Sequence, residues 1–112
     1  MRAEIENIVG DDRKSLDLLK QRMDWDTAAF RLEEFDAMSE DPKLWDDPEK
    51  AQKLMRERQM LAAAIEGFTE LSQGLQDNID LIELGEMEDD QEVIKEAETA
   101  IQKIQTEAAK QE

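Results

Sequence analysis

One apolar seam, about five heptads long, constrains this chain more than any other feature. From Ala51 to Ile82, apolar residues recur at steps of three and four, interrupted by the polar residues Arg58 and Ser72. This spacing places the apolar side chains on one face of an α-helix. We therefore predict a single helix over residues 48–85, which would be about 50–60 Å long at 1.5 Å per residue.

Three further leucines widen the apolar stripe of this long helix, namely Leu71, Leu81 and Leu84. A stripe that is wider than a two-helix seam buries its side chains only against several partners. We therefore expect the long helix to pack against more than one neighbouring helix.

Local signals predict both ends of the long helix. The sequence Asp47-Pro48-Glu49 supplies a carboxylate cap, a proline in the first turn and an acid near the positive end of the helix dipole. At the other end, Gly85 precedes the acidic run 86–92, and glycine tolerates the left-handed conformation that ends many helices. The helix should therefore begin at Pro48 and end at Gly85.

The N-terminal segment predicts a helix over residues 2–22. Its apolar residues keep the seam spacing if the polar Asp12 occupies one seam position. Gly10 weakens this helix, because a glycine in a helix interior costs roughly 1 kcal/mol relative to alanine. We expect the start of the chain to fray. The apolar seam residues are Ile5, Val9, Leu16, Leu19 and Met23.

Two more helices follow from similar patterns. Residues 24–27 form a connection, with Asp26 or Thr27 as the cap of a helix over residues 27–39. Pro42 stops that helix, because proline cannot continue the hydrogen-bond ladder and restricts the residue before it. After the acidic run, an aspartate cap begins an antiparallel return helix over residues 91–110.

Composition agrees with a few long helices. Charged and hydrophobic residues each make up 39% of the 112 residues, and the chain has four Gly and two Pro to form turns. A chain of this length has room for one domain. We predict an all-α fold, a coiled-coil-like antiparallel helical bundle of about four helices with one long central helix, as a single domain over residues 1–112.

The net charge of −16 restricts the partners of this chain. Residues 1–40 carry 6 basic and 11 acidic groups, residues 41–85 carry 5 and 10, and residues 86–112 carry 3 and 9. Nucleic-acid binding needs cations that displace counterions from phosphates. We therefore expect no strong independent binding of nucleic acid, and basic protein surfaces are the better partners.

No membrane association is expected. The sequence has no apolar window of the length that crosses a bilayer, and its first residues lack the pattern of a secretory signal. Cys is absent, which excludes disulfide bonds and does not by itself indicate a compartment.

The residue types also argue against an enzyme, a cofactor and a metal site. His and Cys are both absent, so the usual zinc and di-iron ligand sets are missing. The acidic run 86–92 lacks the alternating ligands and central glycine of a calcium loop. Carboxylates are frequent on every predicted helix, so their proximity does not indicate acid–base catalysis. We predict no catalytic residue, no cofactor and no metal.

Five residues are candidates for contact with a partner: Trp25, Trp45, Lys50, Lys53 and Arg56. Each has a structural alternative, which we favour for Trp45 and for the three cations and weigh more evenly for Trp25. The ring of Trp45 would plug the core at the base of the long helix. The cations would pair with acids along the helix, such as Lys53 with Glu49 and Glu57.

The run Trp45-Asp46-Asp47-Pro48-Glu49-Lys50-Ala51-Gln52 carries information that a generic coiled coil does not need. With Pro42, it sets two prolines and a tryptophan at fixed offsets around a helix start. This run resembles the bacterial class-I peptide chain release factors of type 2, which read UGA and UAA. The resemblance continues through Gly74-Leu75-Gln76-Asp77-Asn78, Leu81-Ile82-Glu83-Leu84 and the acidic residues 88–91.

The resemblance implies that residues 1–112 are the N-terminal helical domain of a longer cytoplasmic translation termination factor. The helical sequence that continues to Glu112 agrees with a piece of a longer chain. In this family a Gly-Gly-Gln loop promotes peptide release and a Ser-Pro-Phe element helps read the codon. Neither motif occurs in these 112 residues, so the chain itself would neither read codons nor release peptide.

The implied partners are the ribosome, at the large-subunit stalk base and GTPase-associated region, and the class-II GTP-binding release factor. The alternative is a free-standing acidic coiled-coil adaptor or scaffold that acts through helix–helix association. Seams of this length can pair within a monomer or between two copies. The sequence is therefore compatible with a homodimer of an excised fragment.

Overall fold

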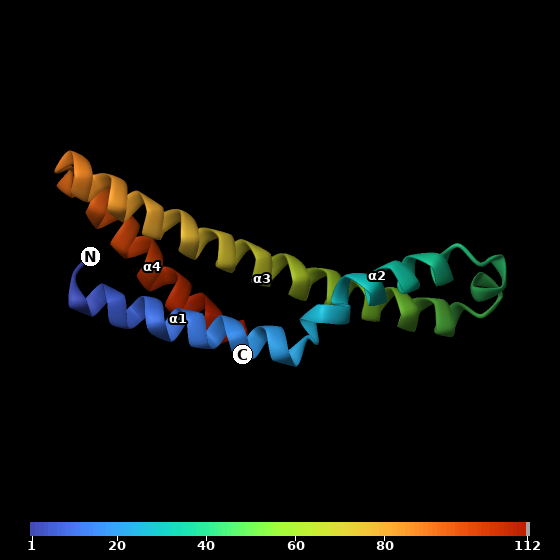
Figure 1. Cartoon of the computed structure of the whole chain (residues 1–112). Helices are drawn as coiled ribbons and strands as arrows, with labels where there is room; N and C mark the ends of the chain where they lie inside the picture. Colours follow the sequence, from blue (N-terminus) through green and yellow to red (C-terminus); the bar gives the residue numbers. More distant parts are fainter. Residues whose placement is uncertain (112) are drawn as a thin grey trace. The chain divides into compact units, whose positions relative to one another are not determined.

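The computed structural model describes residues 1–111 and consists almost entirely of helices (Figure 1). No strand occurs among these residues, which confirms the predicted all-α fold with one long helix. The elements are α1 (Ala3–Arg22), α2 (Trp25–Ser39), the 3₁₀ helix η1 (Pro42–Asp46), α3 (Pro48–Glu88) and α4 (Gln91–Gln111).

The helices form two compact units. We call residues 1–19 and 68–111 the three-helix unit, because they comprise most of α1, the second half of α3, and α4. We call Lys20–Gly67 the hairpin unit, which contains α2, η1 and the first half of α3. α3 therefore contributes residues to both units.

Polar contacts at its ends show how the three-helix unit is threaded. The amino group of Met1 contacts Glu86 near the end of α3, and Arg2 contacts Glu98 early in α4. α1 therefore runs antiparallel to α3 and parallel to α4, as the ribbon shows (Figure 1). The antiparallel packing of α3 with its neighbours confirms the predicted bundle.

The core of the three-helix unit follows the predicted seams. α3 packs against both other helices, as its wide stripe predicts, but Leu81 and Leu84 stay exposed and only Leu71 of the three extra leucines is buried. Burial stabilises each large aliphatic side chain by about 1.5–3 kcal/mol. The buried apolar residues are Ile5, Val9, Leu16, Leu19, Phe68, Leu71, Leu75, Ile79, Ile82, Ala97, Ile101, Ile104 and Ala108.

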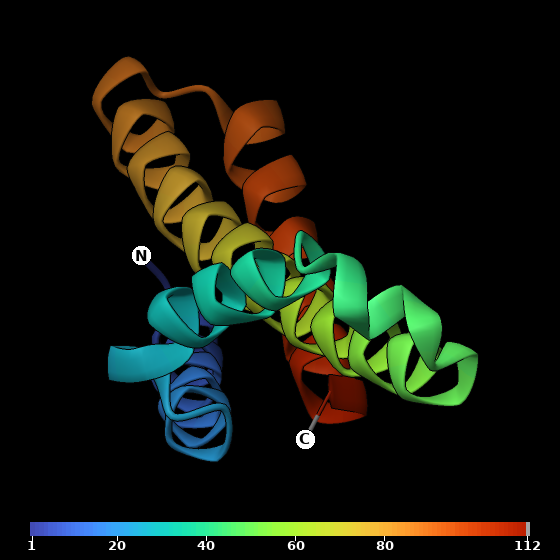
Figure 2. The ribbon, with the colours of Figure 1, turned by 90° about the vertical axis from the view of Figure 1, so that its right-hand side faces the viewer.

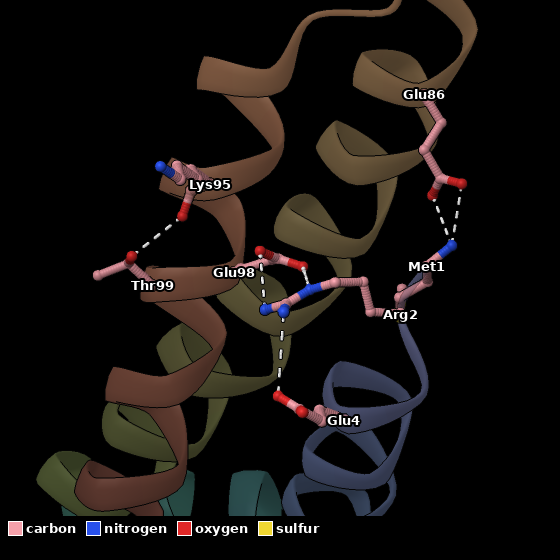
Figure 3. Close-up of polar contacts among 7 residues, drawn as sticks. All are labelled: Met1, Arg2, Glu4, Glu86, Lys95, Glu98 and Thr99. Atoms are coloured by element: carbon pink, nitrogen blue, oxygen red, sulfur yellow. Dashed lines mark hydrogen bonds and ion pairs between the residues drawn. The ribbon is translucent and has the colours of Figure 1, made fainter.

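Two acids contact the first two residues, at the end of the chain where the sequence predicted fraying (Figure 3). The Met1 amino group donates to both carboxylate oxygens of Glu86, at 2.8 and 2.9 Å. Arg2 donates through Nε and Nη2 to the two oxygens of Glu98, at 2.9 and 3.2 Å. The hydrogen bond to Glu86 raises the pKa of the Met1 amino group, so this group stays charged.

Asp12 occupies the seam position that the spacing of α1 assigns to it, and it is 1% exposed. Neither of its carboxylate oxygens has a hydrogen-bond partner within residues 1–111. Burial raises the pKa of Asp12 to about 6, and the neighbouring charge of Asp11 adds to the shift. This seam position therefore costs stability whenever the carboxylate is ionised.

Gly10 lies inside α1 without any close neighbour that would require a glycine. A Cβ atom built at this position meets nothing within 4 Å. We expect Gly10→Ala to raise the free energy of unfolding by about 0.5–1 kcal/mol, because alanine loses less backbone entropy in a helix. Urea denaturation followed by circular dichroism measures the change, and a less stable variant would contradict the expectation.

α3 runs one turn further than predicted, to Glu88, so Gly85 does not end the helix. The left-handed residue is Asp89, with φ of 55°. The Asp89 N–H donates to the Glu86 carbonyl at 3.4 Å and the Asp90 N–H donates to the Gly85 carbonyl at 2.8 Å. This pair of bonds is a Schellman motif built on aspartate, which also tolerates the left-handed region.

Gly85 has a packing role instead of a turn role. A Cβ atom at this buried position would lie 2.7 Å from Cγ1 of Ile94 and 3.2 Å from the Asp90 carbonyl oxygen. The missing side chain therefore allows α4 to approach α3 closely at their connection. The predicted aspartate cap of α4 is confirmed, since Oδ1 of Asp90 accepts the Val93 N–H at 3.3 Å.

In the hairpin unit, α2 begins at Trp25 and not at residue 27, so the predicted caps Asp26 and Thr27 are wrong. Asp24 precedes the helix in the left-handed region, with φ of 52°. Its carbonyl accepts the Thr27 N–H at 3.0 Å, and its Oδ2 accepts the Thr27 hydroxyl at 2.8 Å. These bonds replace the side-chain cap that the sequence suggested.

α3 begins at Pro48 as predicted, and Oδ1 of Asp47 accepts the Lys50 N–H at 3.3 Å. The sequence did not predict η1, the short 3₁₀ helix before it. Arg58, a polar residue within the predicted seam, forms an ion pair with Asp36 of α2. α2 therefore lies beside the first half of α3, as both ribbon views show (Figure 1, Figure 2).

No helix within residues 1–111 is both long enough and apolar enough to span a membrane.

Candidate partner-contact surface

The five candidate residues all lie in the hairpin unit, but the structure does not gather them in one place. Trp25 begins α2, whereas Trp45 lies in η1, beyond the other end of that helix. At 1.5 Å per residue, the 15 residues of α2 are about 22 Å long. Lys50, Lys53 and Arg56 occupy the first turns of α3, immediately after η1.

Trp45 is not the core plug that we favoured from the sequence, because 54% of its surface is exposed. Its indole N–H donates to the carbonyl of Ser39, the last residue of α2, at 2.9 Å. The polar edge of the ring is therefore satisfied by the hairpin itself while much of the apolar ring stays in solvent. The short 3₁₀ turn holds Trp45 on the outside of the unit.

The ring of Trp45 lines a shallow hollow with the first turns of α3. Arg56 belongs to this hollow, so a cation and an aromatic ring share one site. Ala51 is buried and Met55 is partly exposed there, which gives the site an apolar part. Such a site fits an apolar or aromatic group that carries negative charge nearby. The lining residues are Trp45, Ala51, Gln52, Met55, Arg56 and Gln59.

Lys50, Lys53 and Arg56 are exposed, and their side chains form no ion pair within residues 1–111, so the predicted pairs of Lys53 with Glu49 and Glu57 are absent. Exposed pairs gain only a few tenths of a kcal/mol and lose side-chain entropy. Lys50 and Lys53 also lie near the positive end of the α3 dipole, which disfavours cations. Their positions do not stabilise the helix, and their charges are available to a partner.

Met55, Gln52 and Gln59 line the hollow but were not among the contact residues predicted from the sequence. Met55 lies four residues after Ala51 and one after Leu54 on the same helix, so helical spacing places it beside the seam. Because it is not a seam residue itself, its exposure could have been inferred from that spacing.

The described part of the chain contains no cluster of three or more acidic side chains that could hold a metal ion.

Comparison with known proteins identifies the class of this helical module. The PCRF domain matches residues 28–112, which include the whole surface around Trp45. The chain therefore belongs to the PCRF domain family.

The resemblance to type 2 release factors is also confirmed. The chain is 59% identical over 112 residues to Peptide chain release factor 2 of Ruegeria sp. (strain TM1040), covering 100% of this chain and 30% of the relative. The same coverage holds for Peptide chain release factor 2 of Roseobacter denitrificans at 56% and of Paramagnetospirillum magneticum at 50% identity. The chain thus spans 30% of the length of these curated relatives.

Proposed function

We propose that residues 1–112 form the N-terminal helical domain of a longer type 2 release factor and act in translation termination in the cytoplasm. The domain would position the factor at the large-subunit stalk base and GTPase-associated region of the ribosome. The observation that carries this proposal is the 59% identity to Peptide chain release factor 2 across all 112 residues. Codon reading and peptide release would belong to other domains, and the domain itself would not be an enzyme.

The hairpin unit supplies the contact in this proposal. Trp45 and Arg56 share a hollow, and Lys50 and Lys53 extend its positive charge along α3. An acidic protein surface on the ribosome, or on the class-II GTP-binding release factor, would complement these groups. Trp25 would make a separate contact at the far end of α2. The net charge of −16 argues against RNA as the main source of affinity.

A second candidate function is that of an acidic coiled-coil adaptor that acts through helix association. The observation that favours it is the exposure of Leu81, Leu84 and Met87 on α3, since exposed apolar residues on a helix can pair with a second copy. Sedimentation of the chain separates the two functions. A stable homodimer that buries these residues would support the adaptor.

The contact is tested by the triple substitution Lys50→Gln, Lys53→Gln and Arg56→Gln. The chain should compete with a full-length type 2 release factor for purified 70S ribosomes, and the triple variant should compete about tenfold more weakly. Three exposed ionic contacts of 0.2–1 kcal/mol each sum to about that factor. Competition should also weaken as salt rises.

A matched control removes three exposed cations from the three-helix unit, at Arg13, Lys14 and Lys103. It changes the net charge equally but leaves the hairpin unit intact. Equal weakening by both triple variants would show that only net charge matters and would contradict the contact. Failure of the unsubstituted chain to compete at low salt would contradict the positioning function itself.

A further inference from the structure

The second half of α3 exposes a row of apolar side chains that the three-helix unit leaves uncovered. Leu81, Leu84 and Met87 are 43%, 46% and 84% exposed. At about 100° per residue, these three positions lie within one third of the helix circumference. The buried Ile79 and Ile82 lie on the opposite side of the helix, so neither α1 nor α4 covers the row.

Acidic side chains alternate with this apolar row. By the same helical spacing, four exposed acids lie among or beside the three apolar residues. None of the four takes part in an ion pair within residues 1–111. Asp77 and Asp80 accept hydrogen bonds from the neutral amides of Gln73 and Gln76, both at 2.9 Å. We call the combined face the acidic stripe: Asp77, Asp80, Leu81, Glu83, Leu84, Met87 and Glu88.

The charge around the acidic stripe is entirely of one sign along the chain. From Gln59 to Ile94 the sequence contains no Lys and no Arg, whereas it contains ten Asp and Glu. α3 therefore has no cation of its own near this face to neutralise the carboxylates. A partner that supplies cations would gain Coulomb energy along the whole row.

Leu18 of α1 shows that exposure alone does not create such a face. This leucine is 49% exposed, much like Leu81 and Leu84. Its neighbours one helical turn away on either side are Lys14 and Arg22, which are basic. The same kind of apolar side chain thus lies in two opposite electrostatic settings within one chain.

We propose that the acidic stripe is a docking surface for a basic amphipathic protein helix. Apolar side chains of the partner would cover Leu81, Leu84 and Met87, and flanking Lys or Arg would pair with the alternating carboxylates. A nucleic acid does not fit, because its phosphates would meet four carboxylates and no cation. The proposal goes beyond the proposed positioning function, because it gives the three-helix unit a protein partner that the contact of the hairpin unit does not require.

The experiment uses a fluorescein-labelled helical peptide of about 14 residues, built from leucine on one face and lysine on the other. Fluorescence anisotropy should show binding to the full chain. A peptide of the same composition with its leucines and lysines in scrambled order should bind at least about tenfold more weakly, because it lacks the apolar face. A peptide with glutamate in place of lysine should not bind.

The apolar part of the acidic stripe is tested by Leu84→Gln with Met87→Gln, which should weaken peptide binding about tenfold. Leu18→Gln is the matched control and should change binding less than about twofold. All three positions are exposed, and unchanged thermal unfolding would show that the variants fold. Unchanged binding by the double variant, or equal weakening by the control, would overturn the proposal.

The charged part is tested by Asp80→Asn with Glu83→Gln. This pair should weaken peptide binding and reduce its dependence on salt, because two ionic contacts are lost. An unchanged salt dependence would overturn the ionic part of the proposal.

The peptide assay involves no ribosome, so its outcome is independent of the competition assay. Peptide binding through the stripe without ribosome competition would overturn the positioning function alone. Ribosome competition without peptide binding would overturn the docking surface alone.

Discussion

Replacement of Asp12 by leucine is expected to raise the free energy of unfolding by about 3 kcal/mol near neutral pH. Asp12 is 1% exposed, and its two oxygens have no partner within residues 1–111. Burial, followed by the charge of Asp11, raises its pKa from 3.8 to about 6. Each pKa unit corresponds to 1.36 kcal/mol, so ionisation of the folded protein costs about 3 kcal/mol.

The stability gained by Asp12→Leu should increase as pH rises. Below pH 3.8 the Asp12 carboxyl is protonated in the folded and the unfolded chain, so its titration contributes no difference there. Between 3.8 and about 6 the folded chain binds the proton and the unfolded chain does not, so the unsubstituted chain loses stability as pH rises. The advantage of Asp12→Leu should therefore grow by about 3 kcal/mol across this window and stay constant above it.

Urea denaturation at several pH values, followed by circular dichroism, measures this difference. Hydrogen exchange of the α1 amides measures the stability of the three-helix unit directly. Tryptophan fluorescence would instead follow unfolding of the hairpin unit, because both tryptophans lie there. Asp17→Asn, an exposed change on the same helix, serves as the control and should alter stability by less than about 0.5 kcal/mol. An advantage of Asp12→Leu that is the same on both sides of the window would contradict the assigned pKa.

Asp12 also shows how far the sequence alone could predict this fold. The three- and four-residue spacing of α1 assigned Asp12 to the seam, because periodicity depends only on the helix itself. Whether its carboxylate would find a donor depends on what α3 and α4 place opposite it. Sequence spacing carries no such information, so the missing partner could be found only in the structure.

Helix ends show the same division between local and tertiary information. The signals at Asp47-Pro48 and Asp90 were correct because a cap acts on backbone groups a few residues away. Asp24 and Asp89 were missed because they adopt the left-handed conformation that glycine more commonly occupies. Gly85, a plausible terminator by sequence, is explained by its close approach to Ile94.

The basic residues of the candidate surface could be predicted from the sequence, whereas the exposure of its tryptophan could not. Lys50, Lys53 and Arg56 form a local basic group in an acidic chain, which is visible in the sequence. The exposure of Trp45 was not predictable, because tryptophan favours burial and η1 leaves no periodic signal. Leu81 and Leu84 were expected in the core for a similar reason, since their chemistry alone cannot say which face of α3 the other helices cover.

The three glycines of the three-helix unit offer a second test with a large expected effect. Gly85→Ala should lower the free energy of unfolding by about 1–2 kcal/mol, even though alanine favours helices. Its Cβ would lie 2.7 Å from Cγ1 of Ile94, an atom next to the branch point of that side chain, and 3.2 Å from a backbone oxygen. Relief of the clash therefore requires a new Ile94 rotamer or a shift of α4, which the close packing of the core resists.

Gly74→Ala and Gly10→Ala are controls with the same chemical change in helices. A Cβ at Gly74 would make ordinary contact with Cδ1 of Ile104 at 3.5 Å, and one at Gly10 would meet nothing within 4 Å. Both should stabilise the chain by about 0.5–1 kcal/mol through helix propensity, so the sign should change at Gly85 alone. If Gly85→Ala is as stable as these two variants, close packing does not explain the glycine. The connection between α3 and α4 would then have room for a methyl group, in conflict with the short distances from Gly85 to Ile94 and Asp90.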